Sequence, residues 1–380
     1  MNLNKYKKDN YIPVPFSNNK IINIKINYRI IFIVIIFTFF ILSLFYVKNQ
    51  RKNISNNLLS KKSIKDNNEN LFLLKLKSIL DREEIYENEM MNKHTTFKLG
   101  GPAKYFVIPK SINKIIKIIQ LCNEFSVEYF ILGNGSNLLV SDHGYDGLII
   151  NINENNFSDM KVMKYNESNY YITVGGGILM RNLAQKLCLL SLTGLEDMVD
   201  IPGTIGGGII MNANSGTKGL IKDSLYKVKV ITPLAEIKEL SKEDCKLRDR
   251  GSLLKDNKYM VIEATFILKK GDKMIIQKTM ADHISRRYAH QPVFFPSAGS
   301  FFLWKKSIFG SLYEKYKDNN LVGYRVGDAM IYPLNIAFIV NLGNAKSSDV
   351  YEIVKVVEKM MKQKYNIDIK KEVVIIGNFQ

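Results

Sequence analysis

The sequence predicts an α+β protein that follows an N-terminal membrane-spanning segment. Residues 30–47 contain no charged side chain, helix-like and strand-like stretches alternate from about residue 71 onward, and glycines cluster after several of the predicted strands. The chain has 380 residues, of which 46% are hydrophobic and 24% are charged. This is the composition of a globular protein large enough to bury a sizeable core.

The N-terminal part divides into a basic polar leader (1–29), a transmembrane segment (30–47) and a polar linker (48–74). Eighteen uncharged residues are just enough to cross a bilayer as a helix. The alternatives are a signal peptide and a buried core strand, but the leader is long, no small-residue cleavage site follows the segment, and a buried strand would be shorter. Six Lys/Arg lie in 1–29 and six in 48–65, so the charge balance does not set the orientation. The polar composition of the linker predicts flexibility.

Hydrophobic spacing places the elements of the globular part. Ser111 is a good helix N-cap, and Ile112, Ile115, Ile116 and Ile119 after it share one helix face. Further helices are expected at 181–192, 272–287 and 349–365, and strands at 129–132, 170–174, 228–232, 260–268 and 373–376.

Three glycine-rich segments lie within about eighty residues, at 133–137, 175–177 and 203–208. Glycines after strands let backbone N–H groups approach a diphosphate without interference from a Cβ. Ordinary tight turns are the alternative. A Rossmann loop is excluded, because Leu138 occupies the position of its last glycine.

Charge, cysteine and histidine usage exclude other classes of function. Of the net charge of +18, half comes from residues 1–70, which hold twelve Lys/Arg against three Asp/Glu. No basic stripe with interleaved aromatics follows, which argues against nucleic-acid binding. The three cysteines form no CxxC and are expected to be buried thiols. The four histidines have no metal-ligand spacing, so no metal site is predicted.

Six motifs in order resemble the UDP-N-acetylenolpyruvoylglucosamine reductase (MurB) family. They are HTTFKLGGPA (94–103), GNGSNLL (133–139), GLEDMVDIPGTIGG (194–207), RDRGS (248–252), QPVFFPSAGSFF (291–302) and KEVVIIG (371–377). The resemblance covers about residues 85–380. The short stretch between Phe301 and Gly323 is similar to the family's second type, which lacks an extra tyrosine-bearing loop.

The resemblance implies a two-lobed FAD-binding domain of the vanillyl-alcohol-oxidase/PCMH type at 75–272. A smaller α+β substrate domain would occupy 273–380, with its last strand returning to the active site. The implied enzyme converts UDP-N-acetylglucosamine enolpyruvate to UDP-N-acetylmuramate in peptidoglycan synthesis, with non-covalent FAD and with NADPH as co-substrate. It would be a monomer with its catalytic part facing the cytoplasm, or an organelle stroma if the N-terminus is a targeting presequence.

By the same resemblance, three residues are catalytic. Arg250 supplies a cation for the substrate carboxylate, Ser300 the proton, and Glu372 further polarisation of the intermediate. Gln291 and Lys305 are expected to bind substrate. The expected FAD contacts are Gly133, Asn134, Gly135, Ser136, Asn137, Gly203, Thr204, Gly206 and Gly207.

The sequence departs from the family pattern at Asp249, Gly251, Leu303 and Trp304, close to the expected catalytic residues. An acid beside Arg250 would partly neutralise its field. Two alternatives therefore stay open: an FAD-dependent sugar or lactone oxidase of the same flavin fold, and a membrane-tethered FAD-binding protein that has lost turnover.

Overall fold

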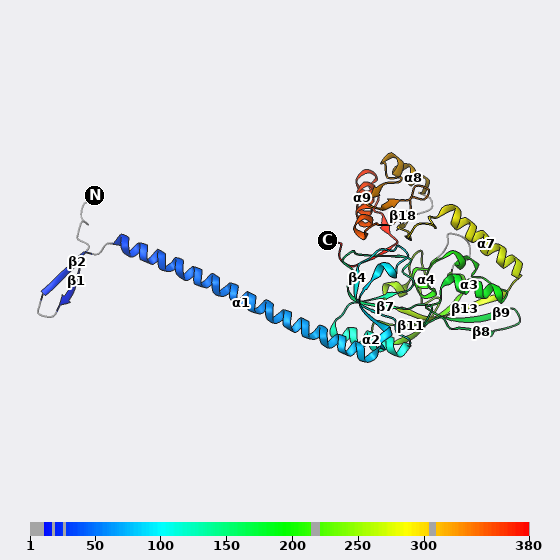
Figure 1. Cartoon of the computed structure of the whole chain (residues 1–380), viewed down its shortest axis with the longest axis horizontal. Coiled ribbons are helices and arrows are strands. Elements are labelled where there is room, and N and C mark those ends of the chain that lie inside the picture. Colours follow the sequence, from blue (N-terminus) through cyan, green and yellow to red (C-terminus); the bar gives the residue numbers. More distant parts are fainter. Residues whose placement is uncertain (1–10, 17–19, 26–27, 214–220, 304–308, 380) are drawn as a thin grey trace, which may run out of the picture. The chain divides into compact units, whose positions relative to one another are not determined.

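The structure is a computed structural model that describes residues 11–16, 20–25, 28–213, 221–303 and 309–379. It consists of two units, Met1–Leu71 and Phe72–Gln380. Figure 1 shows the elements of each, coloured along the chain.

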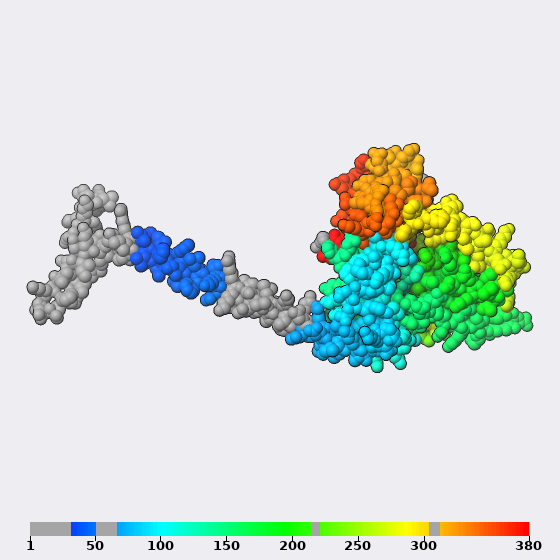
Figure 2. Space-filling model, in the orientation of Figure 1, coloured from blue at the N-terminus to red at the C-terminus, as the bar shows by residue number. Residues whose placement is uncertain are grey.

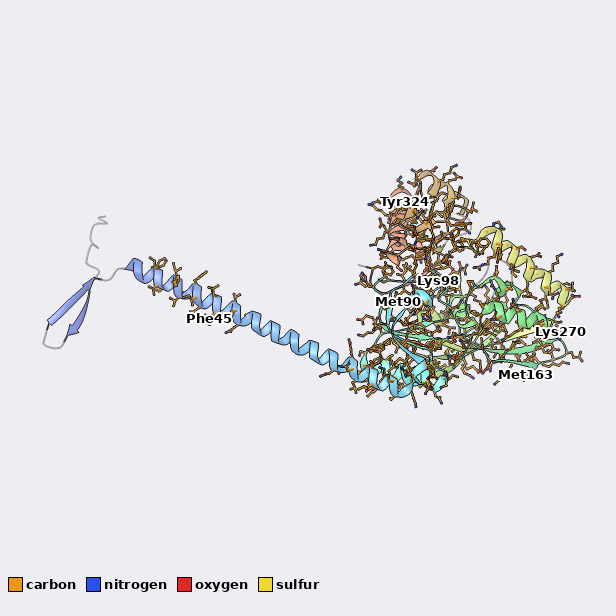
Figure 3. The ribbon with its side chains drawn as sticks, viewed as in Figure 1. Phe45, Met90, Lys98, Met163, Lys270 and Tyr324 are labelled. Carbon is orange, nitrogen blue, oxygen red and sulfur yellow. The ribbon has the colours of Figure 1, made fainter. Side chains whose placement is uncertain are left out.

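The first unit contains a hairpin of β1 (Tyr11–Phe16) and β2 (Lys20–Lys25), followed by the helix α1 (Tyr28–Ile79), whose last residues, from Phe72 onward, belong to the second unit. The stretch Phe32–Gln50 of α1 is long and apolar enough to cross a membrane, and none of it is buried. Phe45, for example, projects from the helix in Figure 3. The helix continues through 48–74, where the composition predicted a flexible linker. No Gly or Pro interrupts that stretch.

The second unit begins with a lobe built on a mixed four-stranded sheet. The helix α2 (Ile112–Phe125) covers it, and the Ser111 hydroxyl accepts a hydrogen bond from the amide of Lys114 at 3.3 Å, as a helix N-cap does. Ile115 and Ile119 of α2 are buried in one hydrophobic cluster with Phe72, which lies near the end of α1. The strands, in spatial order, are β3 (Ile85–Met90), β4 (Pro102–Val107), β7 (Tyr145–Asn151) and β5 (Tyr129–Leu132).

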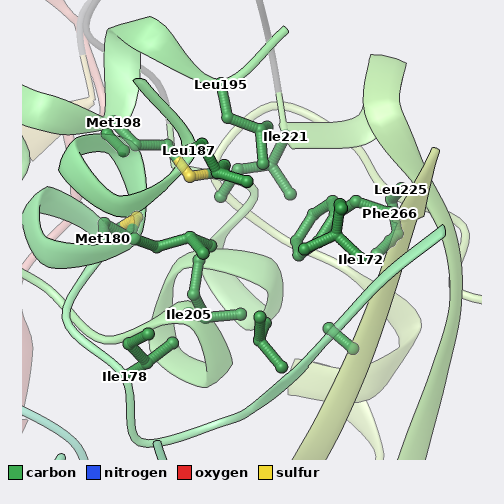
Figure 4. Close-up of a cluster of buried hydrophobic side chains, with 14 of the residues drawn as sticks. Ile172, Ile178, Met180, Leu187, Leu195, Met198, Ile205, Ile221, Leu225 and Phe266 are labelled. Atoms are coloured by element: carbon green, nitrogen blue, oxygen red, sulfur yellow. The ribbon is translucent and has the colours of Figure 1, made fainter. Parts of the chain in front are cut away.

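A second lobe follows, with an antiparallel sheet whose inner face is buried by helices. Its helices include α3 (Met180–Leu189), α4 (Ile205–Met211) and α7 (Lys273–His290). Figure 4 shows Met180 of α3 and Ile205 of α4 in one buried cluster with Phe266 of the sheet. The strands, in spatial order, are β12 (Ile237–Ser241), β11 (Leu225–Ile231), β13 (Met260–Lys270), β9 (Asn169–Gly175) and β8 (Met160–Lys164), with β10 (Leu192–Thr193) also on β13.

A third, smaller body is α+β, as expected for the C-terminal part. Figure 2 shows its orange and red surface adjoining the two lobes. Its core joins Val350 and Ile353 of α9 (Ser347–Tyr365) to Ile339 of the sheet. The sheet order is β14 (Ser297–Ser300), β18 (Phe338–Asn341), β17 (Ala329–Ile331) and β16 (Arg325–Val326), and α8 (Phe309–Asp318) lies between β15 (Phe302–Leu303) and β16 in the chain.

The end of the chain returns to the first lobe. The strand β19 (Lys370–Lys371) pairs with β15, and β20 (Val374–Ile376) lies parallel to β6 (Leu138–Val140), with Val374 opposite Leu138. Because β6 directly follows the glycine segment 133–137, this pairing brings Glu372 next to that segment.

Candidate active site

A cavity of about 1150 Å³ is lined by all three bodies of the second unit. Most of the residues predicted to form the site lie in its wall. They are Gly133, Asn134, Gly135, Ser136, Asn137, Gly203, Thr204, Gly207, Arg250, Gln291, Ser300 and Glu372. Lys305 lies outside the described residues.

The segment 133–137 leaves β5 as a turn whose amides face the cavity. Gly135 has φ +61°, and a Cβ there would lie 2.1 Å from the carbonyl oxygen of His94, so only glycine fits. Among the described residues, no backbone amide of 133–137 donates a hydrogen bond to a protein acceptor. Buried amides in folded proteins normally have partners, so the amide of the buried Gly135 is available to a ligand.

The second wall of the cavity is the start of α4. The Thr204 hydroxyl accepts a hydrogen bond from the Gly207 amide at 3.3 Å and caps the helix. The side-chain amide of Asn134 donates to the carbonyl oxygen of Pro202 at 2.5 Å, which joins the two glycine segments. A Cβ on Gly133 would lie 2.5 Å from Thr204 Oγ1, so the close approach of the segments requires glycine.

Gly206 and Gly207 have different surroundings. Gly207 is exposed and lines the cavity. Gly206 is buried and does not line it, because a Cβ there would lie 3.0 Å from the carbonyl oxygen of Gly176 and 3.1 Å from that of Val261. Gly206, predicted as a cofactor contact, therefore supports the packing of α4 on β13 and is not part of the cavity wall.

The two glycine segments suit a dinucleotide. Unpaired amides facing a concave wall bind a diphosphate, and the length of the cavity reaches from the first lobe to the third body. No histidine or cysteine belongs to the wall in the described part of the chain, so it offers no side chain of the usual kind for a covalent flavin link. The described residues also contain no cluster of potential metal ligands, and all three cysteines are buried, as predicted.

Arg250 and Glu372 form an ion pair in the cavity wall, with 3.0 Å between Arg250 Nε and Glu372 Oε1. Arg250 occupies a tight turn with φ +51°, closed by two backbone hydrogen bonds between Arg248 and Gly251. Burial raises the pKa of Glu372, Arg250 opposes that shift, and the negative charge of Asp249 adds to it. The unexpected Asp249 thus acts on the Glu372 carboxylate.

Ser300 ends β14 in the same wall. The preceding Gly299 has φ +80°, which gives the strand a sharp end before Phe301. The amide of Glu372 donates to the carbonyl oxygen of Phe301 at 2.9 Å, so the backbones that carry the serine and the carboxylate are joined directly. The structure therefore brings Arg250, Ser300 and Glu372 to one cavity from three distant parts of the sequence.

The charged residues of the wall that were not singled out from the sequence include Asp200 and Arg287. Arg287 lies one helical turn before Gln291, which continues the same face of α7, and that spacing is a signal the sequence offered. Asp200 ends the 3-10 helix Glu196–Asp200, just before the glycine segment 203–208. Nothing in the sequence marked Asp200 as buried, because aspartate is usually exposed.

Comparisons with known proteins agree with this geometry. Residues 103–241 match the FAD binding domain family, and residues 291–376 match the C-terminal domain of UDP-N-acetylenolpyruvoylglucosamine reductase. The reductase of that name from Clostridium novyi (strain NT) is 40% identical over 303 residues, covering 80% of this chain and 95% of the relative. That of Lachnoclostridium phytofermentans is 37% identical over 308 residues, covering 81% and 98%.

Among solved structures, the UDP-N-acetylenolpyruvylglucosamine reductase of Thermus caldophilus superposes with a TM-score of 0.61 at 28% identity. The match covers 76% of this chain and 98% of that one. The predicted fold class, a PCMH-type FAD-binding domain with a smaller C-terminal domain, is confirmed. The chain therefore belongs to the UDP-N-acetylenolpyruvoylglucosamine reductase family.

Proposed function

We propose that this chain reduces the enol-ether double bond of UDP-N-acetylglucosamine enolpyruvate with NADPH, giving UDP-N-acetylmuramate for peptidoglycan synthesis. The observation that carries the proposal is the convergence of Arg250, Ser300 and Glu372 on the cavity that the glycine segments also line. The named relatives, aligned over most of their length, support the same reaction.

The residues that would hold FAD are the amides of 133–137 at the diphosphate and Gly203, Thr204 and Gly207 along the second wall. The fit rests on the free amides and on the glycines whose Cβ would collide with the facing segment. Bound FAD supplies hydride, which it has received from NADPH.

Arg250 would stabilise the negative charge that develops when hydride adds to C3 of the enolpyruvyl group. The electron pair of the double bond then moves toward C2 and the substrate carboxylate. A preorganised cation in a partly buried site lowers such a barrier, and a guanidinium matches a carboxylate with two parallel donors. The ion pair with Glu372 holds the guanidinium in position before substrate arrives.

Ser300 would deliver the proton to C2, which completes the addition of one hydride and one proton across the double bond. A serine hydroxyl is a weak acid, so it needs a charged network to replace its proton. Glu372, tied to the backbone next to Ser300 and of raised pKa, is placed for that role. Gln291 lines the cavity and is proposed to bind substrate. Lys305 remains a proposal from the family resemblance alone.

One experiment separates this function from its alternatives. The purified protein is reduced anaerobically with NADPH until its flavin absorbance bleaches, and the enolpyruvyl sugar nucleotide is then added. Rapid return of the absorbance together with UDP-N-acetylmuramate in the product supports the proposal. Bleaching without recovery supports a protein that has lost turnover, and hydrogen peroxide from a sugar without NADPH supports an oxidase.

We also propose that α1 anchors the catalytic unit to a membrane. The apolar stretch Phe32–Gln50 is unburied along its whole length, unlike the core helix of a soluble domain. NADPH and nucleotide sugars are cytosolic, so the catalytic unit would face the cytoplasm. The full chain should stay with membranes after carbonate washing, whereas a variant lacking residues 32–50 should be released. A mature protein found to begin after residue 50 would instead indicate a cleaved targeting sequence.

A further inference from the structure

The turn that carries Arg250 is tied to the C-terminal end of α4. The turn spans residues 248–251, and its two internal hydrogen bonds join Arg248 to Gly251. The helix α4 itself lines the cavity through residues that include Gly207 and Met211. The proposed chemistry uses α4 for the cofactor and the turn for the substrate, so the contacts between these two elements help to fix the place of the guanidinium.

Two side chains make this connection, one from each side. The Asn212 side-chain amide, at the end of α4, donates to the carbonyl oxygen of Arg248 at 3.0 Å. The Ser252 hydroxyl, directly after the turn, donates to the carbonyl oxygen of Ile210 at 2.8 Å. Positions 248 and 252 lie two residues before and two residues after Arg250. Arg250 is therefore bracketed by hydrogen bonds to the end of one helix.

Neither connection is a surface contact. Asn212 is 3% exposed and Ser252 is fully buried, so water does not readily replace a bond that is removed. Ile210 belongs to the last turn of α4, where carbonyl groups lack a donor within the helix. The Ser252 hydroxyl supplies that donor, and its oxygen also accepts from the Lys255 amide at 3.1 Å as the N-cap of α6 (Leu253–Asp256). Both bonds thus hold the turn from inside the fold.

The backbone at Asn212 does not by itself require asparagine. Asn212 has φ +44°, the left-handed conformation in which helices commonly end on glycine. Glycine adopts this conformation without strain. The helix α9 also ends on a left-handed asparagine, Asn366, but that residue is exposed and does not line the cavity. What distinguishes Asn212 is its side chain, which reaches the turn of Arg250.

We infer that Asn212 and Ser252 are positioning residues that hold the Arg250 guanidinium in a fixed place relative to α4. The inference rests on the proposed function, because it concerns the cation of that reaction. Neither Asn212 nor Ser252 lines the cavity, so their effect on turnover passes through the turn. Misplacement of a reacting group by 1 Å can cost about a hundredfold in rate.

The two half-reactions of the full-length protein in detergent test the inference. Asn212→Gly keeps the helix end and removes the amide, and Ser252→Ala removes the hydroxyl. Each should slow reoxidation of the reduced flavin by the enolpyruvyl sugar nucleotide about tenfold to a hundredfold. Reduction by NADPH should stay within about twofold of the wild-type rate, because no negative charge develops on the substrate in that step. Stopped-flow absorbance measures both rates.

A double substitution separates positioning of Arg250 from a general loss of packing. In an Arg250→Lys protein the guanidinium is already absent. If Asn212 and Ser252 act through it, adding Asn212→Gly or Ser252→Ala to that protein should slow reoxidation by less than about threefold.

The pH profile gives a second readout that lost packing alone would not move. Arg250 opposes the effect of burial on the pKa of Glu372, whereas Asp249 adds to that effect and Lys255 opposes it. A displaced Arg250 opposes it less, so the pKa of Glu372 rises further. The acid limb of kcat should therefore move to higher pH in Asn212→Gly.

Matched substitutions elsewhere serve as controls. Asn366→Gly removes a left-handed asparagine from the end of another helix. Ser224→Ala removes a hydroxyl that donates to the carbonyl oxygen of Gly194 at 3.0 Å. Neither Asn366 nor Ser224 lines the cavity, and both variants should keep the wild-type rates. If loss of the N-cap unfolds Ser252→Ala, then Asn212→Gly and Asn366→Gly carry the test.

Two results would overturn the inference alone. One is reoxidation of Asn212→Gly at the wild-type rate. The other is an undiminished slowing when Asn212→Gly is added to Arg250→Lys, because the side chain would then act on something other than Arg250. A wild-type protein whose reduced flavin is not reoxidised by the sugar nucleotide would instead overturn the proposed function, so the two failures are distinguishable.

Discussion

The side-chain amide of Asn137 donates to the backbone carbonyl oxygen of Glu372 at 3.2 Å. The segment whose amides face the cavity therefore also holds the carboxylate that pairs with Arg250. The turn 133–137 is therefore expected to contribute both to cofactor binding and to the position of Glu372. A substitution in this turn should affect both.

Removal of that hydrogen bond by Asn137→Ala should cost about 1 kcal/mol of stability and slow turnover roughly tenfold. The reason is that Glu372 loses the contact that fixes its backbone beside the cavity. The measurement is kcat together with the thermal midpoint. Asn335→Ala is the control, because the Asn335 side-chain amide likewise donates to a backbone carbonyl oxygen, that of His290 at 2.9 Å, but Asn335 does not line the cavity. Equal losses of kcat in both variants would argue against a specific role for Asn137.

Arg250→Lys keeps the charge but loses the planar fork, and we expect it to slow reoxidation of the reduced flavin by substrate about 10²–10³-fold. Reduction by NADPH should be nearly unaffected, because the developing substrate charge is absent from that step. Stopped-flow absorbance separates the two half-reactions. Arg248→Lys, two residues away in an exposed pair with Asp256, should change neither rate.

The raised pKa of Glu372 predicts how activity depends on pH. Burial lifts this pKa above its ordinary value of 4.5, so the carboxylate takes up a proton at a higher pH than an exposed glutamate would. The ion pair with Arg250 is then lost as pH falls through the raised value, and kcat should fall with it. Glu372→Gln should lower kcat and remove this acid limb. If kcat of the variant falls at low pH as it does in wild type, the fall belongs to another titrating group.

Gly207 and Gly206 offer a test of which wall faces the cofactor. Gly207→Ala places a methyl group in the cavity, where the nearest protein atom is Thr204 Oγ1 at 3.4 Å. It should weaken FAD binding about tenfold to a hundredfold with little change in thermal midpoint. Gly206→Ala should instead lower the thermal midpoint and change FAD binding little, because its Cβ would meet backbone oxygens inside the fold. Fluorescence titration with FAD and thermal unfolding measure the two effects.

Asp197 predicts an unusual dependence of stability on pH. Burial, with a contribution from the charge of Asp200, raises the pKa of Asp197 to about 7 from an ordinary value of 3.8. Between these values the folded state holds a proton that the unfolded state releases, so stability falls as pH rises through that window. At about 1.4 kcal/mol for each pKa unit, the loss amounts to roughly 4 kcal/mol.

Asp197→Asn removes this titration and should make the protein more stable than wild type at about pH 8, with a smaller difference near pH 5. Urea unfolding at the two pH values measures it. The exposed Asp318→Asn should shift neither curve. A wild-type protein whose free energy of unfolding does not decline over this range would contradict the prediction.

Local elements could be predicted because they depend on neighbours in sequence. Ser111 and the spacing of the isoleucines after it predicted α2 and its first residue correctly. The continuation of α1 through 48–74 could not be predicted, since its polar residues show no amphipathic period. Gly206 and Gly207 could not be told apart either, because neighbours in a helix point about 100° from each other and only the packing of α4 decides which one is buried.

The candidate site was recognised from motif order, but its assembly was not predictable from local pattern. Arg250 and Glu372 meet because β20 runs parallel to β6, a pairing between segments far apart in the chain. Neither flanking sequence carries a signal for that register. Asp200 was missed for a related reason, since the end of its 3-10 helix is held by hydrogen bonds from Arg181 and Arg287, which come from other parts of the chain.

The parallel pairing of β20 with β6 also sets an order of events during synthesis. Glu372 follows every other element that builds the cavity wall except β20 itself, so a chain still on the ribosome has its glycine turns long before it has the carboxylate. The apolar part of α1, the proposed membrane anchor, emerges before every strand and helix that builds the cavity. A nascent chain released before residue 372 would carry the nucleotide-facing loops yet leave β6 without its parallel neighbour and Arg250 without its counter-charge.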